Sequence, residues 1–340
     1  VFAVSTAEAA SKCQRIFTAR DVAQGPIEIT SPEAVLTKLY DESQILGIAV
    51  ADHSNFHPFR RLVELLEVRG HDPKLKTVVI EDSHLRAELY ASMSQRPMSL
   101  DEFRQAATAL YPAFHPQDTF MFEHVFPLLR KINAKRPNDP VVAVPVDGIT
   151  GQTLSESVWG QPQPARLHSP RFTMPNDPKL ELNKYGGSIS RERDTARHFV
   201  SLVADRYPGR KSIVIYHGAH IFKNLRAVGS DADANGRVLK RAFLGWIEIV
   251  RNRIPALKDS YKVIAVDNQS AHWAPNGVLN LPDGVVRHDI HAQGILWQGK
   301  MNLSEPLFTP ESFMATYRKS TISPVHPNAP IFDGVILEAP

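Results

Sequence analysis

Short apolar segments alternate with amphipathic segments along this chain. Residues 44–51 form an apolar run rich in β-branched side chains, and in residues 59–68 the apolar positions recur at i, i+3, i+4 and i+7. The first pattern is typical of a buried strand and the second of a helix with one face in the core. The other strand-like runs cover residues 76–81, 141–146, 212–216 and 261–266, and the other helical patterns cover residues 100–110, 119–133, 191–207 and 237–253.

These segments predict the fold class. Strands that alternate with helices of this length are typical of a mainly parallel sheet with helices on both faces. We therefore predict an α/β fold, formed as a single domain over residues 1–340. Proline, at 26 residues, interrupts the pattern. Residues 160–190 are therefore interpreted as a long loop or lid, and residues 275–340 as a C-terminal extension.

The composition is that of an ordinary globular protein. Charged residues make up 22% of the chain, the formal net charge is +3, and the Lys and Arg residues are dispersed. A nucleic-acid partner is therefore not expected. No apolar stretch approaches the roughly 20 residues of a transmembrane helix, so no membrane-spanning segment is predicted.

Two further features bear on the compartment. The single cysteine, Cys13, excludes an internal disulfide and a zinc site built from cysteines. The first residue is Val1 and not Met, which indicates either a cleaved secretion signal or a shortened chain. We therefore expect a periplasmic or secreted protein, with a cytoplasmic one as the alternative. The oligomeric state stays open.

Polar and titratable residues follow the predicted strands at their carboxyl ends. Ligands of open parallel sheets bind at this edge, so these side chains are the candidates for chemistry. They are Asp52 and His53 after the first strand, Glu81 after the second, Asp147 after the third, and His217 and His220 after the fourth. A neutral imidazole beside a carboxylate can take a proton near pH 7. The same groups are common ligands of zinc and manganese, so a metal site is the alternative.

The motifs of several enzyme classes are missing from the sequence. It contains no GxSxG nucleophile elbow, no GxGxxG fingerprint and no P-loop. Cys13 lies far upstream of the predicted strand ends and has no cysteine-hydrolase signature around it. We therefore expect a reaction in which no protein side chain is the nucleophile.

Several stretches resemble those of one protein family. They are residues 46–54 with the following helix that carries Arg60 and Arg61, residues 77–81 ending in glutamate, residues 144–148 with an aspartate at the strand end, the helix opened by Arg193 and Asp194, and residues 213–220 with two histidines. Over about residues 44–225 the chain resembles the erythromycin esterase-like proteins. Their superfamily also contains ChaN-like haem-uptake proteins and the Tiki metalloproteases.

The resemblance implies a hydrolase that activates water to cleave an ester or a related bond in a small molecule. Carried over, it makes His53 the general base, Glu81 its carboxylate support, and His217 or His220 the second imidazole. Arg61 would stabilise the anion that develops. Residues expected to bind substrate are Arg60, Asp52, Asp147 and Asp194. This reading requires no cofactor, while the Tiki proteins imply a version assisted by a divalent metal.

One position departs from the family pattern. The first-strand glutamate of the family falls on Val50, so an apolar side chain stands where a carboxylate is expected. This departure favours the alternative of a noncatalytic protein that binds haem or another small molecule, as ChaN-like proteins do. Tyr216, His217 and His220 would then be the candidate axial ligands. A third hypothesis is a noncatalytic member with an interaction role, for which the proline-rich loop would form the contact surface.

Overall fold

A computed structural model describes most of the chain. The described residues are 27–50, 56–111, 114, 116–148, 188–223, 225–232, 238–267, 293–297, 321–324 and 332–337. Asp52, His53, Cys13 and the proline-rich stretch at 160–187 lie outside these residues, as does most of the predicted C-terminal extension.

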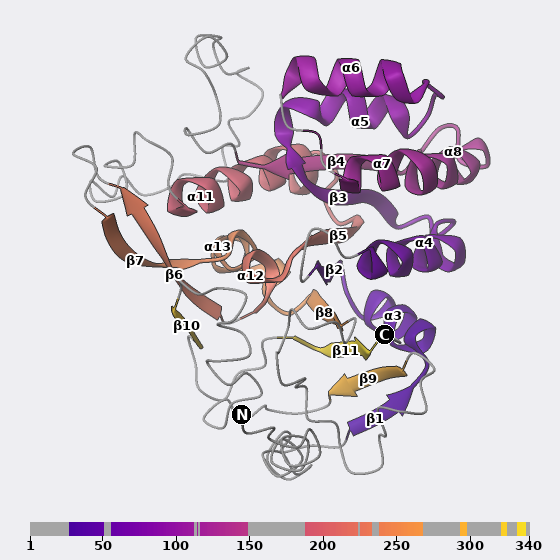
Figure 1. Cartoon of the computed structure of the whole chain (residues 1–340). Coiled ribbons are helices and arrows are strands. Elements are labelled where there is room, and N and C mark those ends of the chain that lie inside the picture. Colours follow the sequence, from indigo (N-terminus) through magenta and orange to yellow (C-terminus); the bar gives the residue numbers. More distant parts are fainter. Residues whose placement is uncertain are drawn as a thin grey trace, which may run out of the picture.

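An eight-stranded sheet forms the centre of the molecule (Figure 1). In spatial order its strands are β1 (Ile27–Thr30), β9 (Gln293–Trp297), β11 (Gly334–Leu337), β8 (Tyr261–Asp267), β2 (Ile45–Val50), β5 (Lys211–His217), β3 (Leu75–Ser83) and β4 (Val142–Asp147). From β11 to β4 every neighbouring pair is parallel, and β9 and β1 add antiparallel strands at one edge. The predicted α/β class and the mainly parallel sheet are confirmed.

Helices cover both faces of this sheet. On one face lie α3 (Pro32–Asp41), α4 (His57–Arg69), α5 (Ala87–Met93), α6 (Leu100–Leu110) and α8 (Phe126–Ala134), and on the other lie α11 (Ser188–Phe199), α12 (Gly218–Ile221), α13 (Trp246–Arg253) and α14 (Pro255–Lys258). Successive side chains of a strand point to opposite faces, so each strand contributes to two cores. In β2, Ile45 and Ala49 pack in one core, and Leu46 and Ile48 pack in the other.

Short helical turns join several of these elements. They are the 3-10 turn η1 (His84–Arg86) after β3, the short helix α7 (Pro116–Phe120), and the π-helical turns η2 (Met121–Val125) and η4 (Val200–Ala204). The predicted helix over residues 119–133 therefore exists but contains a π-helical turn. The predicted helix over residues 100–110 coincides with α6, whose start is held by a capping box between Ser99 and Glu102.

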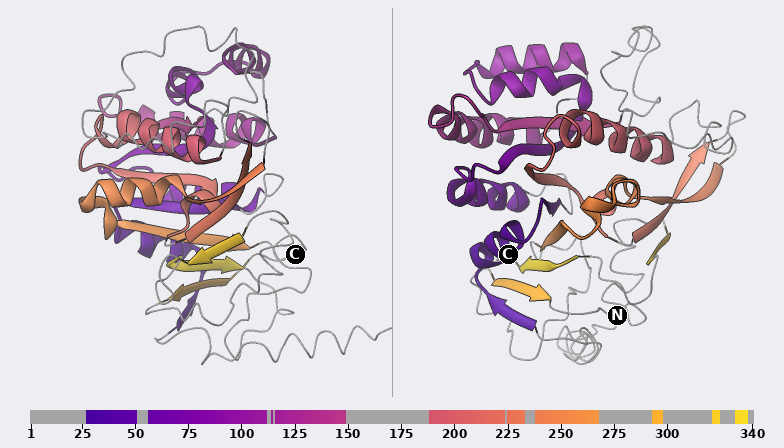
Figure 2. Two further views of the ribbon diagram at one scale, coloured as in Figure 1. Left: turned by 90° about the vertical axis from the view of Figure 1, so that its left-hand side faces the viewer. Right: turned by 180° about the vertical axis from the view of Figure 1, so that it is seen from behind.

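One element prediction is wrong in its first half. Residues 237–253 were expected to form a helix, but residues 238–244 form strand β7 (Val238–Leu244), and the helix α13 begins only after Gly245. Strand β7 pairs with β6 (Leu225–Ala232), and β10 (Thr321–Pro324) completes a small three-stranded sheet beside α12 and α13 (Figure 2). Pairing with β6 overrides the helical pattern of this segment, because a strand is stabilised by its neighbours more than by its own sequence.

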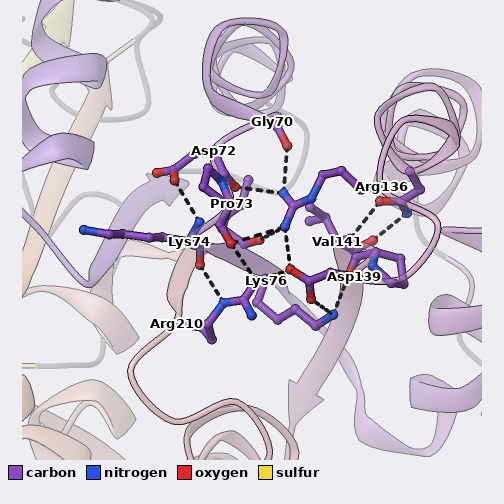
Figure 3. Close-up of polar contacts among 12 residues, drawn as sticks. Gly70, Asp72, Pro73, Lys74, Lys76, Arg136, Asp139, Val141 and Arg210 are labelled. Atoms are coloured by element: carbon purple, nitrogen blue, oxygen red, sulfur yellow. Dashed lines mark hydrogen bonds and ion pairs between the residues drawn. The ribbon is translucent and has the colours of Figure 1, made fainter.

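A network of hydrogen bonds and ion pairs lies at the amino-terminal edge of the sheet (Figure 3). The guanidinium of Arg136 donates hydrogen bonds to the backbone oxygens of Gly70, Asp72 and Leu75, at distances of 3.1, 2.8 and 3.0 Å. It also pairs with Asp139 at 3.1 Å. These bonds hold the loop between α4 and β3 at the edge opposite to the candidate site. None of the helices in the described part of the chain has the length and apolar composition needed to cross a membrane.

Candidate functional site

An arginine from α11 lies between two strand-end carboxylates. Arg191 Nη2 donates to Glu81 Oε1 at 2.8 Å, while Arg191 Nε and Nη2 reach the two oxygens of Asp147 at 2.8 and 2.9 Å. The Glu81 side chain is only 7% exposed, so two carboxylates and one guanidinium share a largely buried position. Burial alone would lower the pKa of Arg191, but the charges of Asp147 and Glu81 outweigh it and raise the pKa well above its usual value. Arg191 therefore stays a cation.

Further donors fix the carboxylate of Asp147. Tyr216 Oη donates to Asp147 Oδ1 at 2.7 Å, and Thr195 Oγ1 lies 3.3 Å from the same oxygen. The backbone N–H of Gly148 in turn donates to Thr195 Oγ1 at 2.7 Å. A Cβ atom on Gly148 would lie 2.5 Å from the backbone oxygen of Arg191. Helix α11 therefore approaches the end of β4 closely because residue 148 has no side chain.

A second carboxylate of α11 orients His220. Glu192 Oε1 accepts a short hydrogen bond from His220 Nδ1, and its other oxygen accepts the backbone N–H of Trp246 at 2.6 Å. This N–H lies in the first turn of α13, where a negative charge is favourable. Burial lowers the pKa of His220, but the charge and hydrogen bond of Glu192, together with the charge of Glu81, raise the pKa above its usual value. The Glu192–His220 pair therefore resembles the carboxylate–imidazole part of a hydrolase triad.

The two histidines of β5 and α12 meet this cluster from one side. The backbone N–H of His217 donates to Glu81 Oε2 at 2.6 Å, and the rings of His217 and His220 have centroids 5.6 Å apart. His220 Nε2 lies 3.4 Å from Arg191 Nη1. A carboxylate assigns the proton of His220 to Nδ1, so Nε2 carries the lone pair that can accept a proton.

The structure brings together four of the residues singled out in the sequence, namely Glu81, Asp147, His217 and His220. The contacts of Asp194 are different, because its carboxylate pairs with Arg197 on the same helix at 3.3 Å. Arg61 forms an ion pair with Glu64 on α4 at 2.6 Å.

Other predicted site residues contribute less or lie outside the described chain. Arg60 is exposed. Val50, where the family pattern has glutamate, is 2% exposed and packs in the apolar layer beneath α3 and α4. Position 50 therefore contributes to the core and not to the cluster. Asp52 and His53 are not among the described residues, so their roles stay predictions.

Sequence reasoning missed Arg191 and Glu192, and it chose Arg193 and Asp194 in their place. A signal was present, because Arg191, Thr195 and His198 recur at i, i+4 and i+7 of the predicted helix. These polar residues lie on one face of a helix that packs against the sheet. A polar stripe on a packed face indicates contacts with other buried polar groups.

Comparisons with known proteins find solved structures of low sequence identity. No protein-family model matches the chain, and no curated protein matches it. A solved succinoglycan biosynthesis protein is 10% identical, with 99% of this chain and 98% of that chain covered and a TM-score of 0.48. A mutant of the erythromycin esterase EreC in its open conformation is 13% identical, with coverages of 92% and 97% and a TM-score of 0.47. A protein from Bacillus cereus is 11% identical, with coverages of 99% and 98% and a TM-score of 0.44.

Proposed function

We propose that this protein is a hydrolase that activates water at the carboxyl edge of its sheet and cleaves an ester or a related bond in a small molecule. The observation that carries the proposal is the Glu192–His220 pair, in which Glu192 is buried and His220 Nε2 faces the Arg191 cluster. A carboxylate on Nδ1 holds the imidazole in one tautomer and stabilises the imidazolium that forms when Nε2 takes a proton.

The proposed reaction uses the site as follows. An imidazole removes a proton from water, and the resulting hydroxide forms a bond to the carbonyl carbon of the substrate. The tetrahedral oxyanion then expels the leaving-group oxygen, which takes the proton back from the imidazolium. Arg191 Nη1 lies 3.4 Å from His220 Nε2; when water takes the place of this long contact at Nε2, the Nη1 hydrogens can donate to the oxyanion.

Two histidines are candidates for the general base. The family resemblance assigns the base to His53, and the geometry of the Glu192–His220 pair makes His220 the second candidate. Separate substitutions distinguish the two, because loss of the base lowers kcat by about 10²–10⁴-fold.

The position of Arg191 bears on whether a divalent metal ion assists the proposed hydrolysis. The guanidinium of Arg191 lies between Glu81 and Asp147 and supplies the positive charge that a divalent cation would supply there. Among the residues that the structure describes, no group of three His, Cys, Asp or Glu side chains is arranged to hold a metal ion. We therefore propose water activation by imidazole, with the role of a metal decided by chelation.

The alternative of haem binding has less support. Tyr216, one of the candidate axial ligands, is 1% exposed and its hydroxyl donates to Asp147. Ligation of iron by this oxygen would require both the loss of that bond and access to a buried residue. His220 is likewise held by Glu192.

The test is hydrolysis of a panel of aryl, alkyl and macrocyclic esters by the wild-type protein and by His53→Ala, His220→Ala and Glu192→Gln, each with and without chelator. His71→Ala is the matched control, because His71 is an exposed histidine at the opposite edge of the sheet. Activity that is lost in His53→Ala or His220→Ala and kept in chelator and in the control supports the proposal. Activity lost in chelator identifies a metal-dependent reaction, and no activity above the buffer rate on any ester contradicts the proposal.

Glu192→Gln adds a prediction about pH. The charge of Glu192 raises the pKa of His220, so its removal lowers that pKa. If His220 is the base, activity falls with decreasing pH as Nε2 becomes protonated, and this fall occurs at lower pH in Glu192→Gln than in the wild type. An unchanged pH profile would exclude His220 as the base.

A further inference from the structure

Two imidazoles stack behind Asp147, outside the cluster described above. His84 lies in η1 directly after β3, and His198 lies on α11. Their ring centroids are 3.6 Å apart with an angle of 27° between the ring planes. Both residues are buried, at 6% and 7% exposure. The two residues lie far apart in the sequence, so the tertiary structure brings their rings together.

Each ring reaches a backbone oxygen at the end of β4. His84 Nδ1 lies 3.2 Å from the oxygen of Asp147, and His198 Nδ1 lies 3.1 Å from the oxygen of Val146. A backbone carbonyl only accepts, so Nδ1 is the protonated nitrogen in both rings. The two histidines thus donate to successive carbonyl groups of one strand.

The position of β4 favours such a donor on its outer side, because successive carbonyl groups of a strand point to opposite sides. Among the strands that the structure describes, β4 is the last one of the large sheet and pairs with β3 on one side. Buried carbonyl groups without a partner are costly, and side chains commonly supply the missing donor. An apolar pair would fill the same space but would leave these oxygens without the two donors.

The charge state of His198 is suited to this role. Burial, followed by the neighbouring His84, lowers the pKa of His198 to about 3, although the hydrogen bond to Val146 acts in the opposite direction. His198 is therefore neutral at physiological pH, and its Nδ1–H donates without placing a second positive charge beside Arg191. The charged group that acts on His198 besides His84 is Arg197 on α11, and the backbone oxygen that His84 contacts belongs to Asp147 on β4.

We propose that His84 and His198 are positioning residues, which hold the end of β4 so that the Asp147 carboxylate engages Arg191 and thereby sets the charge that His220 experiences. The proposal rests on the proposed function as far as catalysis is concerned. Residues 147 and 191 meet through a bidentate ion pair whose geometry depends on where β4 ends. Small displacements of such groups reduce rates strongly, by up to about 100-fold for 1 Å.

The sign of the effect on His220 follows from the same contacts. The charge of Arg191 lowers the pKa of His220, and Asp147 compensates part of that charge. If Asp147 moves away, Arg191 is less compensated and the pKa of His220 falls. A variant of His198 that never touches His220 is therefore expected to shift the titration of His220.

The experiment compares His198→Leu, which removes the donor to Val146, with His198→Asn, whose amide nitrogen can take the place of Nδ1. The variants His84→Leu and His84→Asn repeat the test at the other ring, so that one unstable protein does not end it. NMR titration of the His220 imidazole in the full chain is the first readout, and kcat and KM on a hydrolysed ester are the second. His71→Ala is again the control.

The Leu variants are expected to lower the pKa of His220 and to reduce kcat by about tenfold or more with little change in KM, and the Asn variants are expected to restore both. Leu and Asn variants that lower the melting temperature but leave the pKa of His220 and kcat at wild-type values would overturn the proposal, since the pair would then be packing alone. If no protein hydrolyses any ester but the pKa of His220 shifts as expected, the positioning role stands and the proposed function fails.

Discussion

Arg86 joins three elements near the carboxyl end of β3 and allows a quantitative prediction. Its side chain is fully buried at 0% exposure. Nη1 donates to Asp82 at 2.9 and 3.0 Å and to Asp118 of α7 at 3.3 Å. Nε and Nη2 donate to the backbone oxygens of Ala107 and Tyr111 at the end of α6, at 3.0 and 2.8 Å. One guanidinium therefore links β3, α6 and α7.

Replacement of Arg86 by Met would leave two carboxylates without this cation. Their side chains are 4% and 5% exposed, so water compensates little of the lost interaction. Loss of one partner of a buried ion pair costs about 3–5 kcal/mol. Two backbone oxygens lose a donor as well, so we expect a loss near the upper value, about 5 kcal/mol at pH 7.5. That is a large part of the roughly 5–15 kcal/mol that stabilises a folded protein.

The loss of stability in Arg86→Met should depend on pH, and the direction of this dependence can be worked out. Burial, followed by the charge of Asp118, raises the pKa of Asp82 to about 6, although Arg86 acts in the opposite direction. A carboxyl group with a higher pKa in the folded state binds protons preferentially there, so its contribution to stability improves as pH falls from about 6 towards its unfolded value near 4. Without Arg86 the pKa of Asp82 rises further. The loss in Arg86→Met should therefore be smaller at pH 5 than at pH 7.5.

Urea unfolding at pH 7.5 and 5.0, followed by tryptophan fluorescence, measures the loss in the free energy of unfolding and its dependence on pH. Arg104→Met is the matched control, because Arg104 is 51% exposed and its distance from Asp101 is 3.8 Å. We expect the control to change the free energy of unfolding by less than about 0.5 kcal/mol. A loss below about 1 kcal/mol in Arg86→Met, or an equal loss at the two pH values, would refute the reasoning.

Two further predictions concern Asp139 and Gly148. Burial would raise the pKa of Asp139, but hydrogen bonds from Arg210, Lys76 and Arg136 lower it well below its usual value. Asp139 is 42% exposed, so Asp139→Asn should cost about 1 kcal/mol at pH 7. The cost should be smaller at about pH 2.5, because aspartate in the unfolded chain takes up its proton near pH 4 while the folded carboxylate does so only at lower pH. Urea unfolding at both pH values checks this, and an equal loss at both would contradict it. In Gly148→Ala the new Cβ clashes with the backbone oxygen of Arg191 on α11. We therefore expect the free energy of unfolding to fall by about 1–3 kcal/mol and kcat to fall at least tenfold. A melting temperature and kinetics equal to those of the wild type would show that α11 moves to accommodate the methyl group.

Much of the fold could be predicted from the apolar pattern. Strands β2, β3, β4, β5 and β8 coincide with predicted runs, because a strand buried on both faces reads as a short continuous apolar segment. Strands β9 and β11 were not predicted, since each is only four or five residues long and lies in a proline-containing region. Strand β7 was mistaken for a helix because its pairing with β6 is decided by the tertiary structure.

The sequence by itself determined which residues would stand at the carboxyl edge. Glu81, Asp147 and His217 end adjacent parallel strands, and parallel strands present their carboxyl ends together. Only the tertiary structure decided how these groups are connected. Arg191 reaches Glu81 from 110 residues away, as α11 crosses the ends of β3 and β4. The orientation of His220 by Glu192 has the same origin, because short-range patterns carry no information on which distant side chain completes a buried charge.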